Sequence, residues 1–112
     1  MEAVPTAAPA QSPQHMRALE YANRVRLARA ALKRSVKAGE RDAADVVRSC
    51  PWEVETMTVA ELLRSQRRWG RTRTHKFLAP LAVSENRQLG RLTSRQRDVL
   101  AHRLEEKTRL TA

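Results

Sequence analysis

The chain has 112 residues, enough for one small domain, and its 22 Lys+Arg against 12 Asp+Glu give a formal net charge of +10 at pH 7. So much positive charge on a short chain repels itself unless an anion offsets it, which predicts nucleic acid, an anionic membrane surface or an acidic protein as the partner. A membrane fits least, because no apolar run approaches the ~18 residues of a spanning helix and the N-terminus lacks the basic start and apolar core of a secretory signal.

The N-terminal residues 1–14 hold three prolines among Ala, Gln, Ser and Thr. Such a stretch cannot bury enough apolar surface to remain ordered, so we predict a disordered tail. From residue 15 to 38, apolar residues recur at spacings of three and four, which predicts a long helix that ends before Gly39. The residues expected on its inner face are Ala18, Tyr21, Val25, Ala28, Leu32 and Val36.

A basic stripe lies beside this apolar face of residues 15–39. Its members are Arg26, Arg29, Lys33 and Lys37, and the only acid in the helix is Glu20. A solvated face is the ordinary interpretation of such a stripe, but solvated faces usually mix both signs of charge. The shortage of acids therefore favours a secondary anion-binding surface on the long helix.

The middle of the chain predicts two further helices. A short one runs from the capping residue Asp42 to Ser49 and is stopped by Pro51. The next begins at Thr58, which forms a capping box with Glu61, and continues to about residue 68. Acids concentrate in residues 40–55, away from the basic regions.

Two helices are predicted in the last third of the chain. One covers residues 71–81 and buries Phe77, Leu78 and Leu81, with its last turn weakened by Pro80. After a loop, the final helix begins at a capping box of Thr93 and Gln96, and we expect the part after about residue 107 to fray. The residues expected on its inner face are Val99, Leu100 and Leu104. No segment shows the alternation of apolar and polar residues that is typical of a β-strand, so we predict an all-α fold.

The most informative segment is an acid-free window between Glu61 and Glu85. Its centre is Gly70, just before a predicted helix start, where unpaired N–H groups and the helix dipole favour phosphate. Because glycine has no Cβ, it lets a ligand approach the backbone closely. The basic and polar residues expected to bind phosphate around this turn are Arg67, Arg68, Gly70, Arg71, Thr72, Arg73, Thr74 and Lys76.

A second basic turn precedes the last predicted helix. It contains Arg87, Arg91 and Arg95, with Arg97 close by. Two basic helix starts joined by one helix and a loop would hold two phosphates at a fixed distance, which suits a duplex groove. The sequence thus predicts double-stranded DNA as the partner, bound through phosphates with little base preference.

The same residues carry a resemblance to a known family. The segments Arg68-Trp-Gly-Arg-Thr-Arg-Thr-His-Lys-Phe-Leu and Asn86-Arg-Gln-Leu-Gly-Arg-Leu-Thr-Ser-Arg-Gln-Arg resemble the helix-two-turns-helix module. Together with the long basic helix, they most resemble the actinobacterial-type integration host factors, over roughly residues 16–105. This resemblance implies a nucleoid-associated protein that bends or compacts DNA and assists recombination or integration. It places phosphate contacts at Gly70, Arg71, Arg73 and Thr74, and at Arg87 and Arg91, although Gln88 interrupts the family's denser arginine run.

The resulting organisation is a tail (1–14), a long basic helix (15–39) and a helical DNA-binding domain (40–107) with the module at about 58–105. We expect the long helix to pack on the domain. We expect a monomer in the cytoplasm, associated with the nucleoid, with an integrase or another DNA-bound protein as a possible further partner.

The remaining candidate residues favour structural roles. Trp52 and Trp69 are expected as core anchors, because large aromatics dominate the burial of a small domain. Cys50, the only cysteine, excludes an internal disulfide and a cysteine-based zinc site, and it is expected to be buried. The three histidines have no metal-ligand spacing, although His75 is close to the phosphate-binding turn in sequence. We therefore expect no metal and no cofactor.

Two other function classes use a similar module and are alternatives to DNA binding by an architectural protein. DNA glycosylases also use a helix-two-turns-helix module, but they resemble larger chains with an N-terminal catalytic proline and usually a zinc finger. The acids Glu53 and Glu55 have no nucleophile or histidine close in sequence, so we expect solvated surface and no enzyme. RNA binding stays open as the alternative, because a ribosomal protein carries a similar module.

Overall fold

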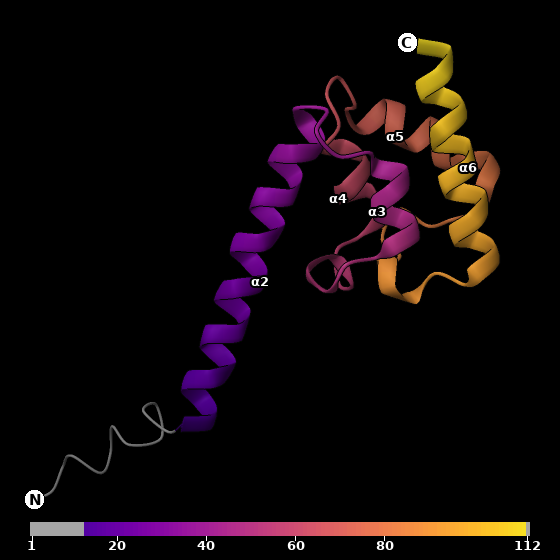
Figure 1. The fold of residues 1–112 in the computed structure, drawn as a ribbon. Helices are drawn as coiled ribbons and strands as arrows, with labels where there is room; N and C mark the ends of the chain where they lie inside the picture. Colours follow the sequence, from indigo (N-terminus) through magenta and orange to yellow (C-terminus); the bar gives the residue numbers. More distant parts are fainter. Residues whose placement is uncertain (1–12, 112) are drawn as a thin grey trace, which may run out of the picture.

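The structure, a computed structural model, describes residues 13–111 and contains helices with no β-strand in that range. The α-helices are α2 (Pro13–Lys37), α3 (Ala43–Ser49), α4 (Val59–Arg64), α5 (Arg71–Leu78) and α6 (Ser94–Thr111). Short 3-10 helices η2 (Trp52–Val54), η3 (Ala79–Leu81) and η4 (Leu89–Arg91) connect them. In Figure 1, α3 to α6 form a compact body, and α2 leaves it as a long arm. The predicted all-α class is confirmed.

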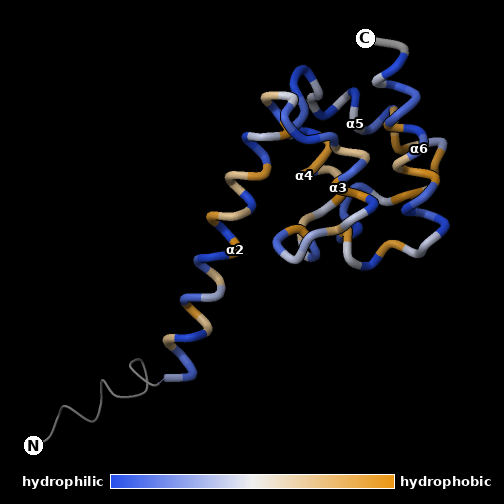
Figure 2. The backbone as a smooth tube through the Cα atoms, in the orientation of Figure 1, coloured by the Kyte–Doolittle hydropathy of each residue, from blue (hydrophilic) through white to orange (hydrophobic). Residues whose placement is uncertain are grey.

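Helix α2 enters the hydrophobic core through its second half. Leu32 and Val36 are its buried residues, and each buried aliphatic side chain contributes about 1.5–3 kcal/mol. The first half of the helix extends beyond the core (Figure 2), and the expected inner-face residues Ala18 and Tyr21 are exposed there. Gly39, with φ +81°, ends the helix as predicted, donating to the carbonyl of Val36 at 3.1 Å.

The predicted tail needs one correction. The helix begins at Pro13, so residues 13–14 are helical, as the fixed φ of proline allows in a first turn. The rest of the predicted tail, residues 1–12, lies outside the described residues.

The residues on either side of α3 differ from the prediction at three positions, Asp42, Cys50 and Trp52. Asp42 is the N-cap residue of α3, but its side chain makes no capping hydrogen bond. Trp52 is 49% exposed, so the expectation of a core anchor was wrong. It lies against Tyr21 in the first half of α2, with ring centroids 6.1 Å apart, and so contacts the arm from outside the core. Cys50 is half-buried and adopts a left-handed conformation that ends α3.

Helix α4 is short because its start and its end are both capped. Thr58 Oγ1 accepts the N–H of Glu61 at 3.1 Å, as the capping box predicts. The loop before α6 binds two further N–H groups at the start of α4. The Val59 N–H donates to the carbonyl of Arg87 at 2.8 Å, and the Ala60 N–H donates to the carbonyl of Glu85 at 3.0 Å. The helix stops at Arg64, four residues before the predicted end.

Gly90 closes this loop against the segment before α4. Its N–H donates to the carbonyl of Glu55 at 2.9 Å, and a Cβ on Gly90 would lie 2.9 Å from that same oxygen. Only a residue without a side chain fits, so Gly90 is required for the backbone contact.

Helix α5 ends where Pro80 changes it into the 3-10 helix η3, as predicted. Helix α6 begins with the predicted capping box, in which Thr93 and Gln96 exchange side-chain hydrogen bonds to backbone at 3.0 and 3.1 Å. It remains helical to Thr111, beyond the predicted fraying point. Val99 is 39% exposed and is not part of the inner face, which Leu100, Ala101 and Leu104 form instead.

One hydrophobic core joins α3, α4, α5 and α6. Met57, Leu62, Leu63, Leu89 and Leu100 are fully buried at its centre. Helices α3 and α6 lie side by side, and the Arg48 guanidinium donates to both carboxylate oxygens of Glu105 across them. The core thus fixes the ends of α4 and α5, which present the basic residues.

Candidate nucleic-acid interface

The turn between α4 and α5 is formed by side chains that cap the end of α4. Ser65 and Gln66 hydrogen-bond the carbonyls of Leu62 and Leu63 with their side chains, at 2.5 and 3.1 Å, which ends the helix early. Arg68 then takes a left-handed conformation, with φ 71°. This reversal leaves Arg67 and Arg68 exposed.

The N-terminus of α5 has no side-chain cap. Its N-cap residue is Gly70, and the first intrahelical bond runs from Thr74 N–H to the Gly70 carbonyl, at 3.1 Å. The N–H groups of Arg71, Thr72 and Arg73 precede this bond and have no acceptor within the helix. They concentrate the positive end of the helix dipole. Apart from Gly70 and its chain neighbours, no atom lies within 4 Å of where a Gly70 Cβ would be, so the space at this position is open.

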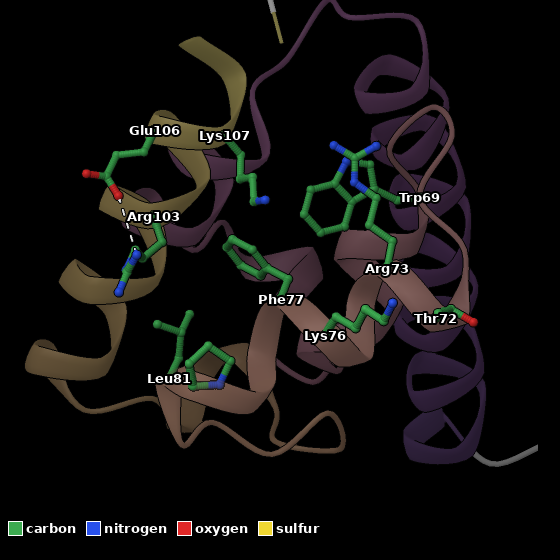
Figure 3. A pocket seen from close by; sticks show the side chains of 10 residues that line it. Trp69, Thr72, Arg73, Lys76, Phe77, Leu81, Arg103, Glu106 and Lys107 are labelled. Atoms are coloured by element: carbon green, nitrogen blue, oxygen red, sulfur yellow. Dashed lines mark ion pairs between the residues drawn. The ribbon is translucent and has the colours of Figure 1, made fainter. Parts of the chain in front are cut away.

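One arginine of the turn is held in place by stacking. The Arg73 guanidinium carbon lies 4.4 Å from the centre of the Trp69 ring, and Figure 3 shows the two side chains against each other. Trp69 in turn meets Phe77 edge-on, with ring centroids 5.2 Å apart. Trp69 is buried, as predicted, and is an anchor for Arg73. A guanidinium held this way loses less side-chain entropy when it binds phosphate.

A basic cleft of 840 Å³ lies between this turn and the end of α2. Its only acid is Glu61, whose carboxylate pairs with Lys33 at 2.9 Å. Its cationic residues are Lys33, Arg34, Lys37, Arg64, Arg67 and Arg68. Arg64 begins the acid-free basic window but was not among the predicted binding residues, and Arg34 was not predicted at all. Periodicity gives the face of one helix but not which faces of two helices meet.

The four residues of the predicted basic stripe on α2 have different surroundings in the structure. Arg29 donates to the Glu53 carbonyl at 2.8 Å and also to Thr56 Oγ1, and Lys33 pairs with Glu61. These two side chains therefore fix α2 to the body. Arg26 donates to Asn23 on the same helix at 2.6 Å, and Lys37 lines the basic cleft.

The second basic turn lies away from the first. In Figure 1 the turn before α5 is at the upper edge of the body, near the end of α2, and the segment before α6 is at its lower edge. Arg87, Arg91 and Arg95 are exposed there. Arg97 points inward instead and donates to the carbonyls of Val47 and Leu89 at 2.6 and 2.9 Å. Arg97 is thus a structural residue.

Three smaller results concern the residues of α5. Thr72 and Lys76 are exposed, whereas the Thr74 side chain is fully buried and its hydroxyl has no hydrogen-bond partner. A direct phosphate contact by that side chain is therefore excluded in this conformation, because the helix turns it toward the core. His75 is exposed and pairs with Glu85 at 2.8 Å.

Two features are absent from the described residues 13–111. They contain no cluster of three or more His, Cys, Asp or Glu residues that could hold a metal ion. None of their helices combines the length and apolar character needed to cross a membrane.

Comparison with known proteins gives one structural likeness. No family model and no curated protein matches the sequence. A solved structure of sIHF bound to an 8 bp palindromic DNA matches with a TM-score of 0.68 and 26% sequence identity, over 76% of this chain and 98% of that chain. The likeness supports the all-α fold and the resemblance to a protein of the IHF type, without specifying the actinobacterial type.

Proposed function

We propose that this protein binds double-stranded DNA through backbone phosphates, with the turn before α5 as its primary anchor. The observation that carries the proposal is the uncapped α5 N-terminus, open in front of Gly70 and flanked by the exposed Arg71 and the stacked Arg73. Oriented N–H groups and a guanidinium can bind the same phosphate, and charge-assisted hydrogen bonds are the stronger kind. The likeness to sIHF in a DNA complex supports the same ligand.

The basic cleft extends this anchor. Arg34 and Lys37 at the end of α2 face Arg67 and Arg68 across it, so a phosphate strand leaving Gly70 meets further cations. The exposed Arg87, Arg91 and Arg95 form a secondary contact, as does Arg26 on the arm. Two contacts at opposite edges of the body favour a DNA that wraps around it, and hence bending or compaction.

In the cell, this activity corresponds to an architectural protein of the nucleoid, of the actinobacterial integration-host-factor type, and not to an enzyme. Residues 58–105 would supply the helix-two-turns-helix module, and α2 the long basic arm. Such a protein assists recombination or integration by shaping DNA for an integrase or another DNA-bound protein.

The test is the salt dependence of binding. If about six phosphates are neutralised, log K should fall against log salt with a slope near −5. Anisotropy titrations with two unrelated duplexes of equal length and an RNA hairpin, at several salt concentrations, measure it. A thousandfold preference for one duplex, a flat salt profile, or tighter binding of the hairpin would each contradict the proposal.

A further inference from the structure

A second hollow, the α5–α6 groove, lies on the other side of Trp69 from the basic cleft. Its volume is 650 Å³, within the range of about 300–1,000 Å³ that ligand sites occupy. Three of its ten lining residues come from α6, which the proposed DNA contact at Gly70 does not use. The residues that line it are Trp69, Thr72, Arg73, Lys76, Phe77, Pro80, Leu81, Arg103, Glu106 and Lys107.

The α5–α6 groove has an apolar floor and a cationic rim (Figure 3). The floor consists of Phe77, Pro80 and Leu81, beside the Trp69 ring. Four cations stand around it, two from α5 and two from α6: Arg73, Lys76, Arg103 and Lys107. The single acid, Glu106, is already flanked by Arg103 at 3.8 Å and by His102 at 3.5 Å. The groove residues therefore carry more positive than negative charge, and the α5 cations Arg73 and Lys76 form no ion pair with its acid.

This combination selects among possible occupants. A DNA backbone would satisfy the cations, but its phosphates and sugars offer no large apolar group to cover Phe77 and Leu81. An uncharged apolar segment would cover the floor, but it would bring no partner for the cations. An acidic segment with a large apolar side chain satisfies both, because arginine clusters recognise acidic motifs and aromatic or aliphatic anchors fill pockets.

We propose that the α5–α6 groove is a docking site for an acidic protein segment that inserts a leucine or an aromatic side chain. The anchor would lie on Phe77 and Leu81, and carboxylates on either side of it would pair with Arg73 and Arg103. Arg73 is suited to this role because stacking on Trp69 already fixes its guanidinium at the rim of the groove.

The site also has a consequence for DNA binding, and this consequence rests on the proposed function. Arg73 and Lys76 belong both to the groove and to the residues assigned to the DNA contact. A carboxylate paired with Arg73 withdraws it from phosphate, so the acidic segment and the DNA compete for this face. A partner that docks here would therefore release the protein from DNA or limit how much of it is bound.

The direct test uses labelled peptides and the full-length chain in the absence of DNA. The probe is a short peptide in which leucine and phenylalanine alternate with aspartate. One control peptide replaces its apolar residues by serine, and the other replaces its aspartates by serine. We expect each control to bind at least about tenfold more weakly than the probe, because each loses one half of the recognition.

Matched charge reversals locate the site. Arg103→Glu, in the groove, should weaken probe binding about tenfold or more, as expected when a charge-assisted contact is reversed. Arg17→Glu, on the exposed first half of α2, changes the net charge equally and should leave probe binding within about twofold. Circular dichroism of both variants confirms that they are folded.

Three results would overturn the docking proposal. The first is that the control peptide without apolar residues binds as tightly as the probe, and the second is that the two charge reversals have equal effects. The third is that the small amphiphilic anion anilinonaphthalene sulfonate binds and the probe does not displace it. Competition is then measured separately, by adding the probe to the DNA complex. If the probe binds and DNA is not released from the protein, only the competition is overturned. If the protein does not bind DNA at any salt concentration, the proposed function is overturned and the docking site is not.

Discussion

The turn before α5 and the turn before α6 contain similar arginines, yet their helix N-termini differ in what occupies them. At α6, the Thr93 hydroxyl accepts the N–H of Gln96 at 3.1 Å, and the Gln96 side chain accepts the N–H of Thr93 at 3.0 Å. At α5, Gly70 offers no side-chain cap. The number of arginines is therefore a poor guide to a phosphate site, and the backbone donors left without a partner are a better one.

The side chains of the two turns differ in the same way. Arg73 is half-buried and stacked on Trp69, whereas Arg97 donates to the carbonyls of Val47 and Leu89. The first arginine is positioned for a ligand and the second for the fold. The comparison predicts that the turn before α5 dominates DNA affinity.

The largest expected effect comes from removing the arginines of the first turn. Arg71→Ala with Arg73→Ala should weaken DNA binding by more than about tenfold at moderate salt, because charge-assisted hydrogen bonds contribute ~1.5–3 kcal/mol each. Arg87→Ala with Arg91→Ala removes the same charge from the second turn and should cost less, since screened surface charges contribute under ~1 kcal/mol. Fluorescence anisotropy of the two folded double mutants measures the difference. A larger loss in the second mutant would reverse the ranking of the two turns.

The two glycines of these regions should separate stability from binding. Gly90→Ala should destabilise the fold by about 1–3 kcal/mol, because the new Cβ would meet the Glu55 backbone. Gly70→Ala meets nothing and should change the unfolding free energy by less than about 1 kcal/mol. Urea unfolding of both variants is the measurement. Equal destabilisation would show that Gly70 is also required by the fold.

Exchanging the caps tests the comparison more finely. Gly70→Ser would give α5 a side-chain acceptor for the N–H groups proposed to bind phosphate, so the free energy of unfolding should rise by about 0.3 kcal/mol. DNA affinity should fall about threefold, because the new hydroxyl competes with phosphate. Thr93→Ala should instead lower stability by about 1 kcal/mol through the lost cap. If Gly70→Ser bound DNA more tightly, the open donors would not be the anchor.

The smallest effect concerns how α6 is held. The hydrogen bond from Arg48 lowers the pKa of the Glu105 carboxyl below its ordinary value. A carboxyl with a lowered folded-state pKa stabilises the fold above its unfolded pKa, and this contribution is lost as the pH falls through the folded pKa. Thermal unfolding from neutral to acidic pH should therefore show a slightly weaker acid destabilisation for Glu105→Gln than for the unchanged chain. Identical pH profiles would show that this exposed pair contributes nothing.

The helices and their caps could be predicted from the sequence because those signals are local. The capping boxes at Thr58 and Thr93, the stop at Gly39 and the weakened turn at Pro80 each depend on residues a few positions apart. The acid-free basic window, and Gly70 within it, are equally readable, since charge and the absence of a Cβ do not depend on the fold.

Contacts between distant segments were decided by the tertiary structure alone. Periodicity predicted one inner face along the whole of α2, but the hydrophobic core reaches only its second half, so Leu32 is buried and Tyr21 is not. Whether an arginine is available to a ligand also depends on distant partners: Glu53 and Thr56 bind Arg29, and Val47 binds Arg97. A sequence fixes which groups carry charge and which stretches turn into helices, but three-dimensional packing determines which of those charges remain for a partner.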